Sequence, residues 1–570
     1  MKHSFVVACG ALLALSACQR AESPAESAAQ SAPAAAPQAS TAPARPASTG
    51  LTPGSRPNIL LIVADDLGYQ DLSIFGGEMQ TPNIDRLFTS GVMMTQFYVS
   101  VACQPTRAML MSGMDHHLAG VGSQGRFIEG NASYQNRLTP DVASTAERMS
   151  ALGYHTSMVG KWHLGLAEGE APADRGFERS FVVLEPGAFH FDLIGYGSRE
   201  GVHYEDDGVP VTSLPDDFYS TITYTDRMIG YMEEASAQDR PFFGYVAYTS
   251  PHWPIQAPDE DIAKVRGRYD EGYDVIRARR FERAKEIGLI PADAAAPRLA
   301  AGITPWNELG AERQASEIAV MEAYAAMVER MDAEIGRMVA RLEALGELDD
   351  TLIMFMSDNG AEGTADDGPF LAQYRAEWNN SVDNIGKRDS YKLIGLAWGD
   401  VGASPDFLTK SSLAQGGIHS PVAINAPGLG LAPGRSDALV AALDIAPTFI
   451  ELAGGENTTT FDGRDVLPMT GRSFAALLRG EIQAVRSDDE ALAFEHGGQR
   501  AVFRGKWKAL WMPPPNGIGN WQLFDLSVDP GETNDLAAAN PDVLADLAAA
   551  YEQHAAAVGV VPPGPPAAAN

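Results

Sequence analysis

Cysteine is scarce in this sequence of 570 residues, which contains only Cys9, Cys18 and Cys103. Small secreted proteins that depend on disulfides carry many more cysteines, so a disulfide scaffold is excluded. Two of the three lie within the first 18 residues, and if these are removed or modified, Cys103 has no partner for an intramolecular disulfide. We therefore expect Cys103 to be kept for a reason other than pairing.

Basic residues are also few: 42 Lys and Arg stand against 74 Asp and Glu, which gives a net charge of -32. Nucleic-acid binding requires Lys and Arg side chains that neutralise phosphates, so nucleic acid is excluded as a partner. A long polyanion would be repelled unless one basic pocket overrode the general negative field. A small-molecule substrate fits this composition better.

The only candidate for a targeting segment is the apolar run 5–15, which follows the basic start Lys2-His3. It is shorter than the roughly 20 apolar residues of a spanning helix, which indicates a secretion signal. Residues 15–18, Leu-Ser-Ala-Cys, look like a bacterial lipobox and predict lipid attachment at Cys18; an ordinary cleaved signal with a chance cysteine is the alternative. Because Gln19 follows in place of Asp, we expect an exported protein anchored by lipid in the periplasm, at the outer membrane.

Composition divides the chain into four parts. Residues 1–18 form the predicted signal peptide, and residues 19–55 are dominated by Ala, Pro and Ser, which predicts a flexible tether. The remaining chain, about 500 residues, is long enough for one large domain and a smaller one. We place the large domain at 56–460 and a small C-terminal subdomain at 461–570.

Short aliphatic runs that stop at polar residues recur through the large domain. Runs of this kind are typical of strands buried on both faces of a parallel sheet. Between them lies a helical pattern of apolar residues at alternating spacings of three and four, from Met321 to Leu345, which Gly346 ends. This order predicts a doubly wound α/β sheet, whose ligands bind beyond the carboxyl ends of the strands. The runs are "NILLIVADD", ending at Asp65 and Asp66; "HTSMVGKWH", at Lys161 and His163; "PFFGYVAYTSPHWP", with His252; and "DTLIMFMSDNG", at Asp358 and Asn359.

Each polar ending alone has an ordinary explanation, as a helix cap, a common turn or a hydrogen-bonded histidine. Together they predict a site, because the carboxyl ends of parallel strands meet at one edge of the sheet. Oxygen ligands are the preference of calcium or magnesium rather than zinc. The residues that supply only oxygen here are Asp65, Asp66, Asp358 and Asn359.

The stretch "CQPTRAMLMSG", residues 103–113, predicts a short helix with Pro105 in its first turn and Gly113 at its end. Cys103 then lies at the helix N-terminus, where free N–H groups favour negative charge. Arg107 lies one turn later on the same face. An anion would be favoured beside Cys103.

These residues resemble a known family. Cys-Gln-Pro-Thr-Arg at 103–107 resembles the Cys-x-Pro-x-Arg signature of type I sulfatases, and "GKWHLG" at 160–165 is similar to the second signature of that family. The blocks "VADDLGYQD", "SPHWP", "SDNGAEG" and "KSSLAQGGIHSP" match in the expected order, most like bacterial arylsulfatases of the alkaline-phosphatase-like superfamily. The chain has Thr106 where Ser is usual, and His419 where Arg is common.

The resemblance implies a role for each matching residue. Cys103 would be oxidised by a separate formylglycine-generating enzyme to formylglycine (3-oxoalanine), whose hydrate is the nucleophile. One calcium ion, with magnesium less favoured, would be bound by Asp65, Asp66, Asp358 and Asn359. Arg107 would stabilise the ionised hydrate, with His163 as a base; Lys161 and Lys410 would hold sulfate oxygens, and His252 would protonate the departing oxygen.

The remaining sequence adds a subdomain and leaves the aromatic residues open. "QRAVFRGKWKALWM" and "NWQLFDLSVDPGETNDLA" predict two alternating strands and a turn, followed by an Ala-rich helix around residues 544–554. We therefore expect a small antiparallel sheet with a helix. Trp162 and Trp253 either stack on an aromatic leaving group or pack in the core.

Three functions are compatible with these features. The first is a lipid-anchored arylsulfatase-type enzyme that hydrolyses small aryl or alkyl sulfate esters. The second is a phosphonate monoester or phosphodiester hydrolase of the same superfamily, because a cationic pocket also accepts the PO₃ group. The third is a non-catalytic calcium-binding lipoprotein.

Overall fold

The computed structural model describes residues 50–366, 368–369 and 371–562. The predicted signal peptide, Cys18 and residues 19–49 of the predicted tether lie outside the described residues. The described residues belong to one compact unit, so the boundary between 460 and 461 stays a prediction. Among these residues, no helix combines the length and the apolar character needed to cross a membrane.

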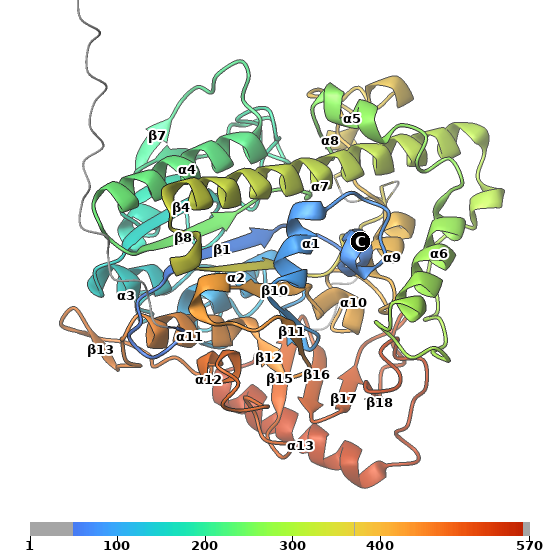
Figure 1. The fold of residues 1–570 in the computed structure, drawn as a ribbon. Helices are drawn as coiled ribbons and strands as arrows, with labels where there is room; N and C mark the ends of the chain where they lie inside the picture. The colour runs from blue at the N-terminus through green and yellow to red at the C-terminus, as the bar shows by residue number, and fades with distance from the viewer. Residues whose placement is uncertain (1–49, 367, 370, 563–570) are drawn as a thin grey trace, which may run out of the picture. The chain divides into compact units, whose positions relative to one another are not determined.

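A large sheet of ten strands forms the centre of the protein (Figure 1). Its strands are β1 (Asn58–Ala64), β2 (Val92–Met94), β4 (His155–Lys161), β5 (Arg179–Val183), β6 (Tyr204–Asp206), β7 (Val209–Val211), β8 (Phe242–Ala247), β9 (Thr351–Ser357), β10 (Val422–Asn425) and β11 (Gly434–Ser436). They lie in the order β11-β2-β10-β9-β1-β8-β4-β5-β6-β7. The five central strands, β9 to β5, are parallel, while β10 and β6 flank them antiparallel. The expected doubly wound, mostly parallel α/β sheet is confirmed.

The central strands are buried on both faces, as their continuous apolar runs predict. Every residue of β1, β4, β8 and β9 is buried. In β1, Ile59, Leu61 and Val63 belong to one core cluster, and Leu60 and Ile62 belong to another. Because side chains alternate along a strand, the two clusters are the two faces of the sheet, each covered by its own layer.

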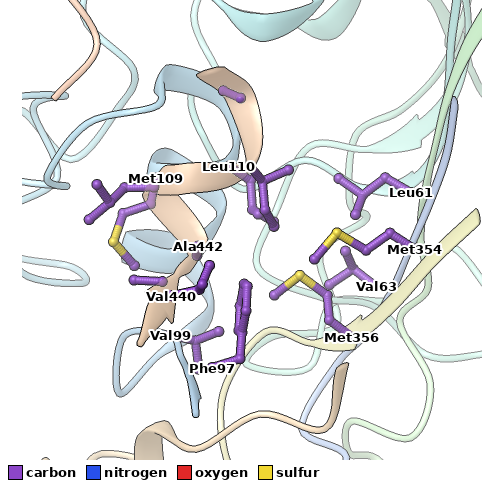
Figure 2. Close-up of a cluster of buried hydrophobic side chains, with 14 of the residues drawn as sticks. Leu61, Val63, Phe97, Val99, Met109, Leu110, Met354, Met356, Val440 and Ala442 are labelled. Atoms are coloured by element: carbon purple, nitrogen blue, oxygen red, sulfur yellow. The ribbon is translucent and has the colours of Figure 1, made fainter. Parts of the chain in front are cut away.

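Helices cover both faces of the sheet. On one face lie α1 (Pro82–Thr89), α4 (Ser220–Ala237) and α7 (Ala311–Leu345), and on the other lie α2 (Cys103–Ser112), α3 (Thr145–Ala151) and α11 (Ile445–Leu452) (Figure 1). Figure 2 shows the packing around α2, where Leu110 lies on the side of Leu61 in β1 and Met109 lies on the side of Val440. The helix that carries Cys103 is therefore fixed directly against the central strands.

The long helix α7 confirms the predicted apolar stripe. Its residues from Met321 to Leu342 at the predicted spacing are buried, and Leu345 is half-buried. The helix ends at Gly346, which adopts the left-handed conformation with φ of 75°. Glycine takes this conformation without the steric cost of a Cβ atom, so it ends the helix at the predicted position.

The C-terminal part contains a four-stranded antiparallel sheet and a helix. The strands are β15 (Leu492–His496), β16 (Gln499–Arg504), β17 (Trp507–Trp511) and β18 (Trp521–Asp525), in sequence order, and α13 (Pro541–Val558) packs on one face. The small antiparallel sheet with a helix is confirmed, but the expectation of two strands is wrong. "QRAVFRGKWKALWM" turns at Gly505 into two strands, and β15 precedes it. Gly505 has φ of 55°, which suits a tight hairpin turn.

The other described elements are short or peripheral. They are the helices α5 (Asp259–Val265), α6 (Tyr273–Glu286), α8 (Ala372–Arg375), α9 (Leu396–Ala403), α10 (Gln415–Ile418) and α12 (Ala475–Leu478), and the strands β3 (Phe97–Tyr98), β12 (Val440–Ala441), β13 (Thr460–Phe461) and β14 (Arg464–Asp465). Helix α6 is held to the segment that follows β1 by Arg280, whose guanidinium donates to Asp71 at 2.8 Å and to Glu78 at 2.7 Å.

Candidate active site

The predicted polar endings meet at the carboxyl edge of the large sheet. Asp65 and Asp66 follow β1, and Asp358 and Asn359 follow its neighbour β9. The backbone N–H of Asp66 donates to Asp358 Oδ1 at 3.3 Å, which joins the two loops directly. Adjacent parallel strands thus bring together two pairs of oxygen-bearing residues, and the pairs are almost 300 positions apart in the chain.

Cys103 is the first residue of α2 and lies against these carboxylates. Its Sγ is 3.3 Å from Asp65 Oδ1 and 3.8 Å from Asp66 Oδ1, and the residue is 1 % exposed. Burial raises the pKa of the Cys103 thiol well above its ordinary value, and the Asp358 and Asp65 carboxylates raise it further. An unmodified Cys103 therefore stays a protonated thiol, which is a poor nucleophile.

Arg107 lies one helical turn after Cys103, as the sequence predicts. Its guanidinium donates to Asp358 Oδ2 through Nη2 at 2.7 Å and through Nε at 3.1 Å. A third bond runs from Nη1 to the Lys161 carbonyl oxygen at 3.0 Å. Because these contacts hold a fully buried side chain in one orientation, Arg107 connects α2 with the ends of β9 and β4.

Two lysines complete the charged group. Lys161, the last residue of β4, donates through Nζ to both oxygens of Asp65 at 2.7 and 3.0 Å. Lys410 donates to both oxygens of Asp66 at 2.7 and 2.8 Å. Both ammonium groups are buried, with exposed side-chain fractions of 0 % and 9 %. Lys410, which the sequence places in a loop, therefore belongs to the site and not to the solvated surface.

The nearby cations neutralise the buried carboxylates of Asp65 and Asp66 to different extents. Burial raises the pKa of Asp66 to about 8, helped by the negative charges of Asp65 and Glu362 and opposed by Lys410. Burial acts in the same direction on Asp65, but the positive charges of Lys161 and Arg107 outweigh it and hold the pKa of Asp65 well below its usual range. A bound cation would relieve the repulsion at Asp66.

The donor set fits a hard cation. Ligand atoms of Asp65, Asp66, Cys103 and His252 lie within 4.8 Å of one another. Of the four predicted ligands, Asp358 and Asn359 join this group through their hydrogen bonds to Asp66. The side-chain oxygen of Asn359 is buried and has no hydrogen-bond partner among residues 50–366, 368–369 and 371–562, so one oxygen ligand is available. This chemistry suits calcium or magnesium.

Two histidines border the group. His252 Nδ1 donates to the Trp253 carbonyl oxygen at 2.5 Å, so its Nε2, 3.6 Å from Asp66 Oδ2, is the unprotonated nitrogen of the neutral ring. Burial lowers the pKa of His252 to about 3. His163 is buried in the left-handed conformation, with φ of 58°, and its Nδ1 has no partner among the described residues. Burial and then Lys161 and Arg107 lower the pKa of His163, which places it electrostatically beside the site.

Two further residues belong to the site although the sequence analysis assigned them no role. Glu362 Oε2 accepts from Trp253 Nε1 at 3.1 Å and lies 3.4 Å from Lys410 Nζ. It stands in the matched block "SDNGAEG", so a closer inspection of that block could have found it. Tyr196 is half-buried, and its ring lies 4.5 Å from the Trp253 ring and 5.7 Å from the His252 ring. Tyr196 lies in a loop and belongs to no sequence motif, so no signal in the sequence could have found it.

The two tryptophans and the two departures from the family pattern have different positions. Trp162 is fully buried and donates to the Glu170 carbonyl oxygen at 2.8 Å, so it is a core residue. Thr106 Oγ1 accepts from the Ser100 N–H at 2.9 Å, a bond that Ser would also make. His419 lies 2.8 Å from Asp406 and lines a separate cleft of about 510 Å³. Neither departure changes a charged group of the site.

Comparisons with known proteins agree with this geometry. Residues 57–455 match the family model described as Sulfatase. A protein of Schizosaccharomyces pombe named an uncharacterized sulfatase is 39% identical over 528 residues, covering 89% of this chain and 94% of that protein. An arylsulfatase of Klebsiella aerogenes is 38% identical over 443 residues, covering 76% and 94%. The crystal structure of Ps i-CgsB superposes with a TM-score of 0.63 at 25% identity, covering 88% of this chain and 92% of that one.

Proposed function

The chain belongs to the sulfatase family, and from this premise we propose that it hydrolyses aryl or alkyl sulfate monoesters to a phenol or alcohol and inorganic sulfate, with formylglycine at position 103 and one bound calcium ion. The observation that carries the proposal is the convergence of Arg107, Lys161 and Lys410 on the two carboxylates that contact Cys103, in a chain of net charge -32. A sulfate group needs cations around it, and these three supply them.

The nucleophile is the first part of the proposal. Cys103 is a free, buried cysteine, and its raised pKa makes thiolate chemistry unfavourable. Oxidised to formylglycine and hydrated, this residue would supply one hydroxyl for attack on sulfur and a second for release of sulfate. Arg107 would stabilise negative charge there, because it is fixed one turn away. His163 would accept the proton that release requires.

The cation site is the second part. Asp65, Asp66, Asp358 and Asn359 would hold calcium, which polarises a sulfate oxygen and lowers the pKa of a coordinated hydroxyl when bound. Lys161 and Lys410 would turn from the carboxylates towards sulfate oxygens once a cation shares Asp65 and Asp66. His252, whose unprotonated Nε2 faces the group, would first take up a proton there and then pass it to the departing oxygen.

The leaving group lies next to an aromatic wall in this arrangement. Tyr196 packs edge-on against Trp253, beside His252. Aromatic side chains in such pairs favour contact with another ring, which supports an aryl sulfate. The Tyr196→Ala variant should raise KM for 4-nitrophenyl sulfate more than KM for an alkyl sulfate. An equal rise for both would remove the argument for an aryl substrate.

Substrate preference tests the proposed reaction. The purified protein should hydrolyse 4-nitrophenyl sulfate with a kcat/KM at least about tenfold above that for 4-nitrophenyl phenylphosphonate. Preference for the phosphonate ester would establish the alternative hydrolase. Absence of turnover for both, in protein whose Cys103 is shown to be oxidised, would favour a non-catalytic calcium-binding protein.

Mass spectrometry tests the modification. Protein from its native host is alkylated, and the peptide carrying Cys103 is measured. Replacement of sulfur by an aldehyde oxygen, trapped with a hydrazine probe, is the expected result. An alkylated, unmodified cysteine throughout would contradict the proposed nucleophile.

Removal of the ion tests the cation site. Dialysis against EGTA should reduce kcat/KM, and calcium should restore it more fully than magnesium, because the donors are carboxylate and amide oxygens. The Asp358→Asn variant should show lower calcium affinity by calorimetry. Full activity without any bound divalent ion would contradict this part of the proposal.

We also propose that the protein is exported and held at the periplasmic face of the outer membrane by lipid on Cys18. The support is the sequence 15–18 and the Ala, Pro and Ser-rich stretch that follows it. Metabolic labelling with palmitate should mark the wild type and not the Cys18→Ala variant. Equal labelling of both, or of neither, would contradict the anchor.

A further inference from the structure

A second buried group of metal-binding residues lies beyond the other end of α2. Asp115, His116 and His117 follow the helix after its terminal Gly113, and they are 7 %, 1 % and 0 % exposed. One ligand atom from each lies within 4.8 Å of the others. The proposed catalytic roles use none of these three residues, and no matched family block contains them.

The hydrogen bonds of His116 fix its protonation. Its Nδ1 lies 2.7 Å from the Val121 carbonyl oxygen, so Nδ1 carries the proton and donates. The other nitrogen, Nε2, is then an unprotonated acceptor, and it is buried without any partner in the described part of the chain. A buried lone pair without a partner is costly, and histidine is the commonest metal ligand in proteins.

His117 is oriented in the matching way. Its Nε2 lies 3.0 Å from Glu495 Oε2, and its Nδ1 faces Asp115 Oδ1 at 2.9 Å. In metal centres, the outer nitrogen of a histidine ligand bonds to a carboxylate or a backbone carbonyl, which fixes the ring for the metal. Val121 serves His116 in this role, and Glu495 serves His117. One nitrogen of each ring and one carboxylate oxygen of Asp115 lie within 4.8 Å of one another.

Segments distant in sequence enclose this group. Glu495 and His496 end β15, and His554 belongs to α13. His554 Nε2 lies 3.4 Å from Asp115 Oδ2, and His496 Nδ1 is buried with no hydrogen-bond partner in the part of the chain that the structure describes. The chain has 11 histidines, and four of them gather here. A ligand bound at Asp115 would therefore tie the loop after α2 to the C-terminal sheet and helix.

We propose that Asp115, His116 and His117 bind one divalent transition-metal ion, with Zn²⁺ as the first candidate, and that this ion fastens the C-terminal sheet and α13 to the helix that carries Cys103. Two imidazoles and one carboxylate form a donor set that suits zinc and its neighbours and not calcium. The ion would replace the proton between His117 and Asp115. A water molecule, or His554 after a shift of its ring, whose Nε2 lies 3.4 Å from Asp115 Oδ2, would complete a four-coordinate site.

Metal content tests the proposal directly. Wild-type protein and variants are incubated with ZnCl₂, passed through a desalting column and analysed by inductively coupled plasma mass spectrometry. Wild type should retain about one zinc ion per chain, and His116→Gln should retain at least about tenfold less. Asp358→Asn should retain zinc as the wild type does, because that residue belongs to the other site.

His155→Gln is the matched control. His155 is equally buried, at 1 % exposure, and lies at the start of β4, outside both polar clusters. It should keep its zinc and the rise in Tm that zinc produces, whereas His116→Gln should lose both. Wild-type protein that retains no zinc, or a loss of zinc from Asp358→Asn but not from His116→Gln, would overturn the proposal.

A measurement on wild-type protein covers the case in which His116→Gln does not fold. Wild type loaded with Co²⁺ should show the visible ligand-field bands of a four-coordinate site with nitrogen ligands. Addition of one equivalent of Zn²⁺ should abolish them, while excess Ca²⁺ should leave them unchanged. No bands, or bands that Ca²⁺ removes, would overturn the proposal.

Discussion

The two ends of helix α2 meet two buried polar clusters of opposite chemistry. At the N-terminal end, the carboxylates of Asp65, Asp66 and Asp358 are paired with Lys161, Lys410 and Arg107. At the C-terminal end, Asp115 and Glu495 are paired with histidine rings, without a lysine or arginine among their described partners. A cluster with lysine and arginine side chains favours hard ions and anionic substrates, whereas imidazole nitrogens that give up their protons favour transition metals.

The comparison predicts that the first cluster governs activity and the second governs stability. Replacing the nucleophile should give the largest effect. Cys103→Ala should reduce kcat for 4-nitrophenyl sulfate by about 10⁴-fold or more, because no other group can take the place of the attacking oxygen. Steady-state kinetics measure this, with Thr106→Ser as a control for the integrity of α2. Unchanged activity in Cys103→Ala would contradict the prediction that the first cluster governs activity.

Loss of one cation should have the next largest effect. Lys161→Met should lower kcat/KM by about 10²- to 10³-fold, because a positive charge on sulfate is lost in a buried site. It should also reduce the free energy of unfolding by about 3 to 5 kcal/mol, since Asp65 loses its closest partner. Urea denaturation measures the second quantity.

Lys506→Met is the control for Lys161→Met. The Lys506 ammonium also pairs with a carboxylate, Asp525, but its side chain is 51% exposed. An exposed pair contributes at most about 1 kcal/mol, so this variant should keep wild-type kcat/KM and nearly wild-type stability. Equal losses in both variants would show that the burial of Lys161 has no importance.

The second cluster should respond in stability alone. Glu495→Gln should reduce the free energy of unfolding by about 1 to 3 kcal/mol, because His117 loses a charged acceptor in a buried position. Its kcat/KM should remain within about twofold of wild type, since the residue touches no reacting group. Glu552→Gln on α13, where the side chain is 68% exposed, should change neither quantity. A large loss of activity at unchanged stability would contradict the division between the clusters.

The smallest expected effect concerns the first turn of α2. Thr106→Val should cost about 1 kcal/mol, because the Ser100 N–H is left without its buried acceptor. Thr106→Ser keeps that acceptor and should cost less than about 0.5 kcal/mol. Thermal unfolding distinguishes the two variants. Equal stability of both would show that the hydroxyl group is unimportant here.

The sequence predicts one cluster and not the other for a physical reason. Asp65, Asp66, Asp358 and Asn359 each follow an apolar run, and parallel strands must bring such endings to one edge. Nothing of this kind relates Asp115 to Glu495 or His554, which approach only because the C-terminal sheet packs on the large domain. No local pattern in a sequence describes such packing.

The same distinction holds for the fold. Four strands and one helix are predictable because their sequences carry long patterns of apolar residues, which the structure buries. They are β1, β4, β8, β9 and α7. Strand β15 is short, and the hairpin of β16 and β17 depends on a turn of only two residues around Gly505. The large sheet is thus predicted well, and the strand number of the small sheet is not.

The burial of α2 also limits when Cys103 can be modified. All ten residues from Cys103 to Ser112 are buried, so a modifying enzyme cannot reach the cysteine once the helix is packed. The oxidation that we propose must occur while this segment is still extended, in competition with folding. Under this proposal, a chain that folds first would become a stable but permanently inactive molecule. The fraction of active protein is then set by the ratio of two rates during biogenesis, and no property of the finished fold can correct it.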